Sequence, residues 1–280
     1  MSTIQQQVAT QLHVKSTINP EQEVKERVAF LQQYLLKTGA KGYVLGISGG
    51  QDSTLAGRLA QLAIEGLNAD TLATPYTFMA VRLPYGVQHD EEDAQAALAF
   101  VNPDRLVSVN IKPAVDAAVL AFQTATGETL GDFHKGNIKA RERMKVQYDL
   151  GAHYGLLVLG TDHAAEAITG FYTKHGDGAC DVAPIYGLNK RQGRALLKYL
   201  GSPQALYEKK PTADLEDLKP GLADEDALGL TYEELDDYLE LKSVTEQTRE
   251  LIERRYKLTE HKRRGSVTLY DDWWKTEGEG

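Results

Sequence analysis

Residues 44–55 constrain the fold of this chain more than any other stretch. The apolar residues 44–47 predict a buried strand, and leucines at helical spacing over 55–62 predict a helix with one apolar face. Between them lies Ser-Gly-Gly at 48–50. A strand, a glycine turn and a helix direct backbone N–H groups and the positive helix end toward an anion, and glycine permits a close approach. We therefore expect a phosphate site at the end of this strand.

The order of residues in this turn separates it from two familiar phosphate-binding motifs. No lysine follows Gly50, so it is not a Walker A loop, and Gly46, Gly49 and Gly50 lack the G-x-G-x-x-G spacing of dinucleotide-binding turns. Ser-Gly-Gly-Gln-Asp-Ser at 48–53 resembles the pyrophosphate loop of N-type ATP pyrophosphatases, which split ATP between its α- and β-phosphates. An ordinary tight turn explains the small residues but not Asp52, where a carboxylate can hold the metal ion that accompanies a phosphate.

Composition indicates a soluble enzyme without naming one. The 280 residues are 42% hydrophobic and 25% charged, with a net charge of −9. This acidic balance argues against non-specific binding of nucleic acid. The polar N-terminus and the lack of a long apolar run predict neither a signal peptide nor a membrane span, and the single Cys180 excludes an internal disulfide. We expect a cytoplasmic protein, built as one domain over residues 1–280, that contacts neither nucleic acid nor membrane.

The rest of the chain alternates predicted strands with predicted helices. Further strands are expected at 78–83, 105–110 and 156–159, and helices begin at Asp90, Lys112 and after 133–137. This alternation predicts an α/β fold with an open parallel sheet and helices on both faces, Rossmann-like in kind. Ligands of such sheets bind beyond the carboxyl ends of the strands, so the loops that follow the strands should share one cleft. Arg82 ends one strand and is expected to contact a nucleotide there.

Capping residues predict several other helices. Asn19-Pro20 begins one that ends at Gly39, Asn189 begins another, and Thr231 to Glu234 forms a capping box. The last helix is expected to run from Val244 through 260–264. Residues 211–226 lack periodicity and are rich in Pro, Gly and Asp, which favours a mobile lid.

The fourth strand is followed by residues suited to a nucleotide and its metal. Thr161 is placed to contact the nucleotide, and Glu166 to supply a second carboxylate. Magnesium bound to a triphosphate takes one or two protein carboxylates, so Asp52 and Glu166 are the predicted pair. Alternatively, Glu166 interacts only with the helix dipole. Asp162 and His163 are interpreted as caps, not as a catalytic dyad.

Basic residues gather in two places in this acidic chain. Four lie on the helix after residue 133, at 139, 141, 143 and 145, and others lie at 260–264. Solvent exposure is the simplest explanation of such runs. Their setting in an acidic protein favours local anion sites instead.

Together, these motifs resemble those of ammonia-dependent NAD synthetase over nearly the whole chain. The motifs are residues 46–53, 82–88, 136–143, 160–170, 211–215 and 260–263. The resemblance implies ATP contacts from Gly46, Ile47, Ser48, Gly49, Gly50, Gln51, Asp52, Ser53, Arg82, Thr161, Lys190 and Thr212. It implies deamido-NAD contacts from Arg141, Lys174, Asp181, His261 and Lys262. It also implies Mg²⁺ at Asp52 and Glu166, and a homodimer whose interface helps to form the deamido-NAD site.

The reaction implied by this resemblance is the last step of NAD biosynthesis. The nicotinate carboxylate attacks the α-phosphate of ATP, an NAD-adenylate forms and pyrophosphate leaves, and ammonia then displaces AMP. Asp52, Lys174 and Lys190 are the expected catalytic residues, acting through position and charge without a protein nucleophile. Free ammonia is the expected donor, because a carboxylate beside Cys180 raises the thiol pKa and makes it a poor nucleophile for glutamine hydrolysis.

Three alternatives differ in class. One is another N-type ATP pyrophosphatase that adenylates a different carboxylate or carbonyl substrate. A second is a tRNA-thiolating enzyme, which needs catalytic cysteines and a basic surface. The third is a non-catalytic nucleotide-binding module, which the two predicted metal carboxylates disfavour.

Overall fold

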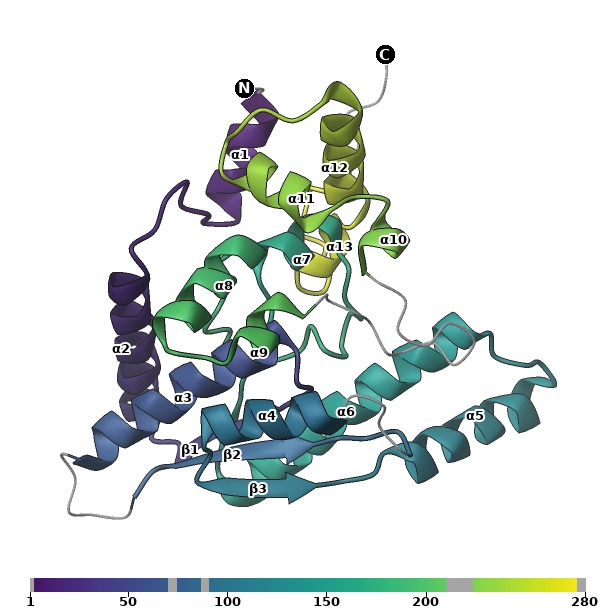
Figure 1. Ribbon diagram of the computed structural model, residues 1–280. Helices are drawn as coiled ribbons and strands as arrows, with labels where there is room; N and C mark the ends of the chain where they lie inside the picture. Colours follow the sequence, from purple (N-terminus) through teal and green to yellow (C-terminus); the bar gives the residue numbers. More distant parts are fainter. Residues whose placement is uncertain (1–2, 70–74, 87–90, 210–223, 276–280) are drawn as a thin grey trace.

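A four-stranded parallel sheet organises the described part of the protein, residues 3–69, 75–86, 91–209 and 224–275 of a computed structural model (Figure 1). The strand order is β3-β2-β1-β4, with every neighbouring pair parallel. The strands are β1 Gly42–Gly46, β2 Thr77–Arg82, β3 Arg105–Ser108 and β4 Leu157–Val158. The predicted α/β parallel architecture is confirmed. The third and fourth strands are shorter than predicted, although an isolated parallel bridge between Leu159 and Val182 extends the β4 edge.

One face of the sheet is covered by helices that also carry the phosphate loop. Side chains alternate between the two faces of a strand, so Tyr43 and Leu45 of β1 point to this face with Phe78 of β2. The Tyr43 hydroxyl donates a 2.6 Å hydrogen bond to the Leu31 carbonyl, which satisfies the one polar group of this buried ring. The covering helices are α2 Pro20–Thr38, α3 Gln51–Ala69, α4 Glu91–Val101, α8 Lys190–Tyr199 and α9 Gln204–Glu208.

The opposite face packs against two helices that are consecutive in the chain. These are α5 Lys112–Thr126 and α6 Asp132–Tyr154. Val44, Met79 and Val81 form the sheet side of this core, and Val115 of α5 is completely buried against them. The sheet therefore has helices on both faces, as the alternation of strands and helices predicted.

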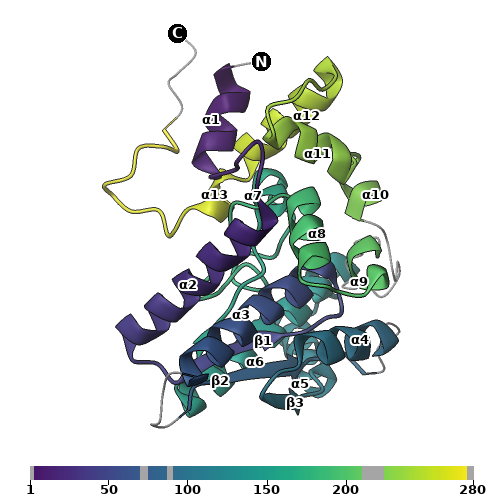
Figure 2. The same ribbon diagram turned by 60° about the vertical axis from the view of Figure 1, so that its left-hand side comes forward.

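A third core lies above α8, at the top of Figures 1 and 2. Its helices are α1 Thr3–Gln11, α7 Ala164–Thr169, α10 Asp224–Leu228, α11 Tyr232–Leu239 and α12 Glu246–Leu258. The short α13 Glu260–Arg263 follows α12 and has no buried residue. Val8, Ile168, Leu235 and Ile252 pack together in this core, so segments from both ends of the chain meet. This core supports the strand-to-helix connection that carries Glu166.

The prediction of one continuous last helix is wrong. Helix α12 ends at Leu258 and α13 begins at Glu260, with Thr259 between them. Thr259 packs on Gly170, where a Cβ would come within 2.4 Å of the threonine side chain. The Arg263 guanidinium donates to the Thr259 hydroxyl and to the Ala167 carbonyl. The break thus docks the basic end of the chain onto α7.

Most of the predicted caps are confirmed, including His163 at the start of α7, but Asp162 caps no described helix and faces the Cys180 thiol instead. Asn19 caps α2 and Gly39 ends it in the left-handed conformation, with φ +70°. Asn189 and Thr231 each form a capping box with the residue three positions later. Asp90, Thr212 and most of the predicted lid (211–223) lie outside the described residues, whereas α10 begins at Asp224.

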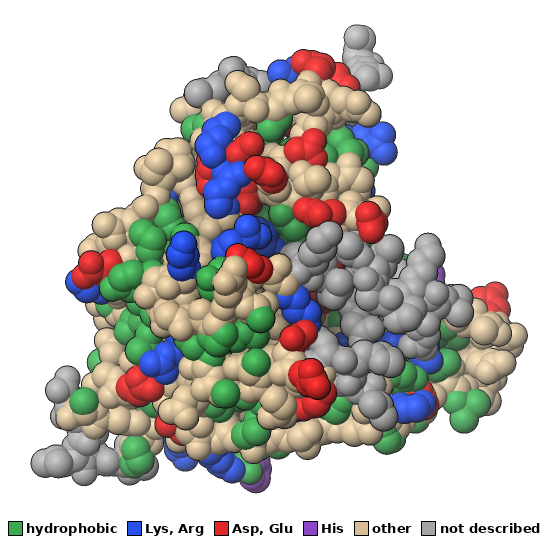
Figure 3. Space-filling model, in the orientation of Figure 1, with side chains coloured by type: hydrophobic (Ala, Val, Ile, Leu, Met, Phe, Trp, Pro, Cys, Tyr) green, Lys and Arg blue, Asp and Glu red, His purple; other side chains and the backbone are tan. Residues whose placement is uncertain are grey.

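Acidic and basic side chains are interleaved on the described part of the face in Figure 3. Arg191 pairs with both Asp237 and Glu240. The pair with Asp237 is partly exposed and contributes little to stability because water and salt screen it, whereas Glu240 is buried. Within the described ranges, no helix has the length and apolar character needed to span a membrane.

Candidate active site

The phosphate loop joins the end of β1 to the start of α3 at the centre of the sheet. Gly49 has φ +91°, and a Cβ there would lie 2.7 Å from the Ala94 backbone nitrogen, so only glycine fits. The hydroxyls of Ser48 and Ser53 lie 3.1 Å apart, and the Gly50 N–H donates to the Ser48 hydroxyl over 3.2 Å. These contacts hold the loop in one conformation at the N-terminus of α3, the kind of position where phosphates bind.

Side chains from neighbouring elements hold the end of the loop that follows β1. Gln147 of α6 accepts a 2.7 Å hydrogen bond from the Gly46 N–H. The buried Arg82 donates to the Ile47 carbonyl and forms a 2.8 Å ion pair with Glu91. Arg82 thus supports the loop from beneath, and its predicted contact with ATP stays a prediction.

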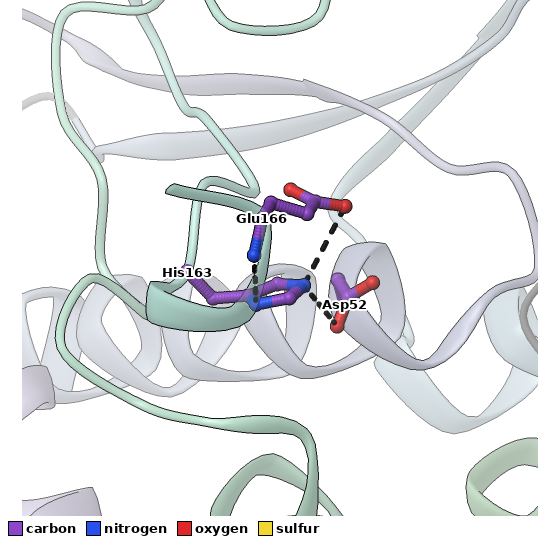
Figure 4. Close-up of side chains that lie close together, drawn as sticks. All are labelled: Asp52, His163 and Glu166. Atoms are coloured by element: carbon purple, nitrogen blue, oxygen red, sulfur yellow. Dashed lines mark hydrogen bonds and ion pairs between the residues drawn. The ribbon is translucent and has the colours of Figure 1, made fainter. Parts of the chain in front are cut away.

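A buried charged cluster, formed by Asp52, His163, Glu166 and Lys190, lies beside the loop. Figure 4 shows the first three of these side chains. Lys190 Nζ, on a side chain only 4% exposed, lies 2.7 Å from Asp52 Oδ2. Burial alone would raise the pKa of Asp52, but the Lys190 ammonium, through its charge and its hydrogen bond, outweighs burial and lowers that pKa. Burial would likewise lower the pKa of Lys190, but the carboxylates of Asp52 and Glu166 outweigh it and raise it. Both members of the pair are therefore charged at neutral pH.

The two carboxylates predicted to bind a metal lie close together although they come from different helices. Asp52 is in the first turn of α3 and Glu166 in the first turn of α7. Ligand atoms of Asp52, His163 and Glu166 all lie within 4.8 Å of one another. Two carboxylates beside a phosphate loop are the oxygen donors that Mg²⁺ prefers, so these residues fit that ion.

Lys190 is positioned by a residue that the sequence did not reveal. The Asp236 carboxylate of α11 accepts hydrogen bonds from the backbone N–H groups of Lys190, at 3.1 Å, and Arg191, at 2.8 Å. Burial raises the pKa of Asp236 to about 6. No local signal marks this role, because Asp236 is 46 positions away from Lys190 in the chain.

Four of the residues predicted to bind deamido-NAD come together in a second, more open group. We call Arg141, Lys174, His261 and Lys262 the basic cluster. Arg141 donates to the Lys174 carbonyl over 3.4 Å, and Lys174 Nζ to the His261 carbonyl over 2.6 Å. Lys262 Nζ donates to the carbonyls of Gly170 and Tyr172, each over 2.7 Å.

The cations of the basic cluster form no ion pair in the described part of the chain. Among the described residues, no carboxylate lies within 4.0 Å of the charged nitrogens of Arg141, Lys174 or Lys262. Burial lowers the pKa of Lys262, and burial together with the charge of Lys174 lowers the pKa of His261. The cluster is consequently suited to binding an anion.

The other predicted contacts are placed differently. Asp181 accepts a 2.8 Å hydrogen bond from the Val158 N–H and a 3.4 Å bond from the Tyr148 hydroxyl, so it also supports the β4 edge. Thr161 is half-buried between β4 and α7, and Thr212 lies outside the described residues. The roles of all three toward ligands stay predictions.

Cys180 lies beside the carboxyl group of Asp162. Its Sγ lies 3.8 Å from Asp162 Oδ2, and burial followed by this carboxylate raises the pKa of Cys180 to about 12. The predicted direction of the shift is confirmed, but burial and Asp162 contribute more than the adjacent Asp181. Burial and Glu166 in turn raise the pKa of Asp162 to about 7.

The fold and the loop define the class of protein. An open parallel sheet with a glycine-rich phosphate loop after an inner strand, and two carboxylates beside that loop, is typical of nucleotide-binding α/β enzymes. The NAD synthase family model matches residues 23–266. The chain belongs to this NAD synthase family.

Individual relatives agree with the family. The chain is 66% identical over 272 residues to the NH(3)-dependent NAD(+) synthetase of Halalkalibacterium halodurans, covering 97% of this chain and all of the relative. The NAD+ synthetase structure from Burkholderia pseudomallei superposes with a TM-score of 0.81 at 46% identity, covering 92% of this chain and 95% of that one. The NMN synthetase structure from Francisella tularensis superposes with a TM-score of 0.80 at 32% identity, covering 91% of this chain and 100% of that one.

Proposed function

We propose that this protein catalyses the ATP-dependent amidation of deamido-NAD by ammonia, forming NAD, AMP and pyrophosphate. The observation that carries the proposal is 66% identity, over the full length of the relative, to an NH(3)-dependent NAD(+) synthetase. A second relative with the same name, from Bacillus subtilis, is 57% identical over 273 residues. The broader alternative, an ATP pyrophosphatase acting on a different carboxylate, is not favoured by relatives this similar.

The ATP polyphosphate binds at residues 46–53 in this proposal. The loop brings the hydroxyls of Ser48 and Ser53 to the N-terminus of α3, and Lys190 places a buried positive charge beside Asp52. Mg²⁺ held by Asp52 and Glu166 would neutralise polyphosphate charge when bound. The chain's own residues then orient the α-phosphate toward the nicotinate carboxylate and offset the charge that develops on the leaving pyrophosphate.

Deamido-NAD binds at the basic cluster in this proposal. Arg141, Lys174 and Lys262 carry charges that no described carboxylate neutralises, and deamido-NAD brings a pyrophosphate and a carboxylate. Their hydrogen bonds to backbone carbonyls fix the side chains before the substrate arrives. Binding energy at this distant part of the substrate therefore serves to position the reacting carboxylate.

Ammonia is the direct nitrogen donor. Glutamine-dependent amidation needs a thiolate nucleophile, and the only cysteine of the chain has a pKa raised to about 12. The proposal therefore assigns Cys180 no covalent role.

The test of this function is NAD formation by the purified protein. We expect NAD and one equivalent each of AMP and pyrophosphate from deamido-NAD, ATP, Mg²⁺ and ammonium. Parallel reactions replace ammonium with glutamine, or deamido-NAD with nicotinate mononucleotide, and both should be far slower. A higher kcat/KM for the mononucleotide would reassign the substrate, and equal use of glutamine would reassign the nitrogen source.

We further propose that the protein is a cytoplasmic homodimer. Phe30 and Tyr34, stacked one turn apart on α2, are 46% and 37% exposed, and Tyr186 across a shallow hollow is 40% exposed. Exposed aromatic residues grouped in this way favour a protein–protein contact. Sedimentation velocity should give twice the 30.9 kDa chain mass, and Phe30→Glu should give the monomer. A wild-type monomer at micromolar concentration would contradict the dimer.

A further inference from the structure

His163 is buried between the two carboxylates of the cluster, yet it belongs to neither the phosphate loop nor the predicted metal ligands. Its side chain is 2% exposed. Nε2 lies 3.6 Å from Asp52 Oδ1 and 3.5 Å from Glu166 Oε1, and it makes no hydrogen bond of normal length among the described residues (Figure 4). A buried polar atom equidistant from two carboxylates calls for a reason, because leaving such an atom unsatisfied is costly.

The other ring nitrogen identifies which atom of His163 carries the proton. Nδ1 accepts a hydrogen bond from the Glu166 backbone N–H over 3.4 Å, and the ring is the N-cap of α7. A neutral imidazole that accepts at Nδ1 has its proton on Nε2. The Nε2–H group therefore points between Asp52 and Glu166, where it attracts both.

This tautomer separates His163 from the metal ligands. A histidine that binds a metal ion through Nε2 offers the lone pair of that atom and keeps its proton on Nδ1. A proton on Nδ1 here would face the N–H of Glu166, so the ring would lose its cap and gain a repulsive contact. His163 is consequently a donor to the carboxylates and not a third ligand.

We propose that His163 is a positioning residue that holds the carboxylates of Asp52 and Glu166 together in the arrangement that receives Mg²⁺. The inference rests on the proposed metal site. Two carboxylates at this separation repel each other, and they stand on two different helices, α3 and α7. Lys190 already engages Asp52 Oδ2, which leaves Oδ1 facing His163. The imidazole thus compensates the repulsion on the side that Lys190 does not reach.

The ring also ties the side chain of Glu166 to its backbone. One nitrogen of His163 holds the N–H of Glu166, and the other faces its carboxylate. Helix α7 is only six residues long, so it has little stability of its own and depends on its cap and its packing. Rotation of the Glu166 side chain away from Asp52 would cost the contact with Nε2, while the backbone hydrogen bond to Nδ1 keeps the ring in place.

Two substitutions separate the two roles of His163, which are the cap of α7 through Nδ1 and the bridge between the carboxylates of Asp52 and Glu166 through Nε2. His163→Asn keeps an oxygen near the position of Nδ1 and caps α7, but it is too short to reach the carboxylates. His163→Gln puts an amide nitrogen near the position of Nε2 and keeps the bridge, but it loses the cap. Thr245→Ala, which removes the threonine N-cap of α12, is the matched control for the loss of a cap away from the site.

The test measures binding of Mn²⁺ alone to each protein by electron paramagnetic resonance, without turnover. We expect His163→Asn to bind Mn²⁺ about 10- to 100-fold more weakly, the usual loss when a group supporting metal ligands is removed. His163→Gln should remain within about threefold of wild type, and Thr245→Ala should match wild type while melting at a lower temperature. Tight Mn²⁺ binding by His163→Asn would overturn the proposal, as would a Gln variant as weak as the Asn variant.

Asp52→Asn and Glu166→Gln distinguish failure of this inference from failure of the metal site. If both variants bind Mn²⁺ weakly and His163→Asn binds it as wild type does, the metal site is supported and the role of His163 is contradicted. If all three variants bind Mn²⁺ as wild type does, both the metal site and the role of His163 are contradicted. Nitrogen-15 spectra should show the proton of His163 on Nε2 both before and after Mg²⁺ is added; an unprotonated Nε2 that shifts with Mg²⁺ would make His163 a ligand.

Discussion

The buried charged cluster at the phosphate loop and the basic cluster near the C-terminus hold their charges in opposite ways. In the first, Asp52 and Lys190 lie 2.7 Å apart and are largely hidden from solvent. In the second, Lys174 and Lys262 donate to backbone carbonyls, and no described carboxylate pairs with them. One group is internally compensated, whereas the other keeps a net positive charge.

The difference follows from the cost of burying charge. A buried ion without a partner is strongly unfavourable, so Asp52 and Lys190 pair with each other before any ligand binds. A partly exposed lysine keeps some hydration and can be oriented by carbonyl oxygens alone. We infer that the first cluster sets geometry and the second attracts a substrate.

The largest effect is expected where the compensated cluster loses a charge. Asp52→Asn and Glu166→Gln should each lower kcat by at least about 100-fold, because each removes a carboxylate that binds the Mg²⁺ neutralising the polyphosphate. Steady-state rates at saturating Mg²⁺ measure this, with circular dichroism to verify that the fold is intact. Near-normal rates in both variants would contradict the metal assignment.

A smaller and selective effect is expected in the basic cluster. Arg141→Ala and Lys174→Ala should each raise the KM for deamido-NAD about 10- to 100-fold, the loss of a hydrogen bond to a charged group, and leave the KM for ATP almost unchanged. Lys145→Ala is the matched control, since Lys145 lies on the same helix as Arg141 but is exposed and paired with Glu142. Equal increases in both KM values would mean that these cations bind ATP.

An effect of intermediate size is expected at Asp236, which accepts hydrogen bonds from the backbone at Lys190. Asp236→Asn should lower the free energy of unfolding by about 1–2 kcal/mol, because a buried acceptor for two backbone N–H groups is weakened. It should also reduce kcat several-fold by loosening Lys190. Asp237→Asn, which breaks exposed pairs with Arg191 and Lys242, should cost about 0.5 kcal/mol or less. Urea unfolding of both variants checks the comparison, and equal losses would contradict it.

The smallest effect is expected at Cys180, which belongs to neither of the two clusters. Cys180→Ser should keep ammonia-dependent activity within about twofold, because no covalent step uses the thiol. A pKa of about 12 leaves roughly one thiol in 10⁴ ionised at pH 8, so alkylation by iodoacetamide should be slow in the folded protein and fast after unfolding. Rapid alkylation of the native protein would show that the thiol is activated.

Sequence alone determined the elements that depend on neighbours in the chain. The strand–glycine–helix pattern at 44–55, the caps at Asn19 and Asn189, and the capping box at Thr231 all act within a few residues, and each forms as predicted. The alternation of strands and helices likewise determined the parallel sheet, because side-chain periodicity and crossover handedness allow few other arrangements. The break at Thr259 was missed because its cause, packing on Gly170, lies 89 residues away.

Only the tertiary structure decided how the candidate site is supported. The motifs pointed to Asp52, Glu166 and Lys190, but not to Asp236 beneath Lys190 or to Gln147 on the Gly46 N–H. The motifs also did not predict that His163, interpreted as a cap, faces two carboxylates from different helices. Such contacts join residues that are tens to more than a hundred positions apart. They exist because buried charges and N–H groups must find partners wherever the fold provides them, and local sequence holds no record of that choice.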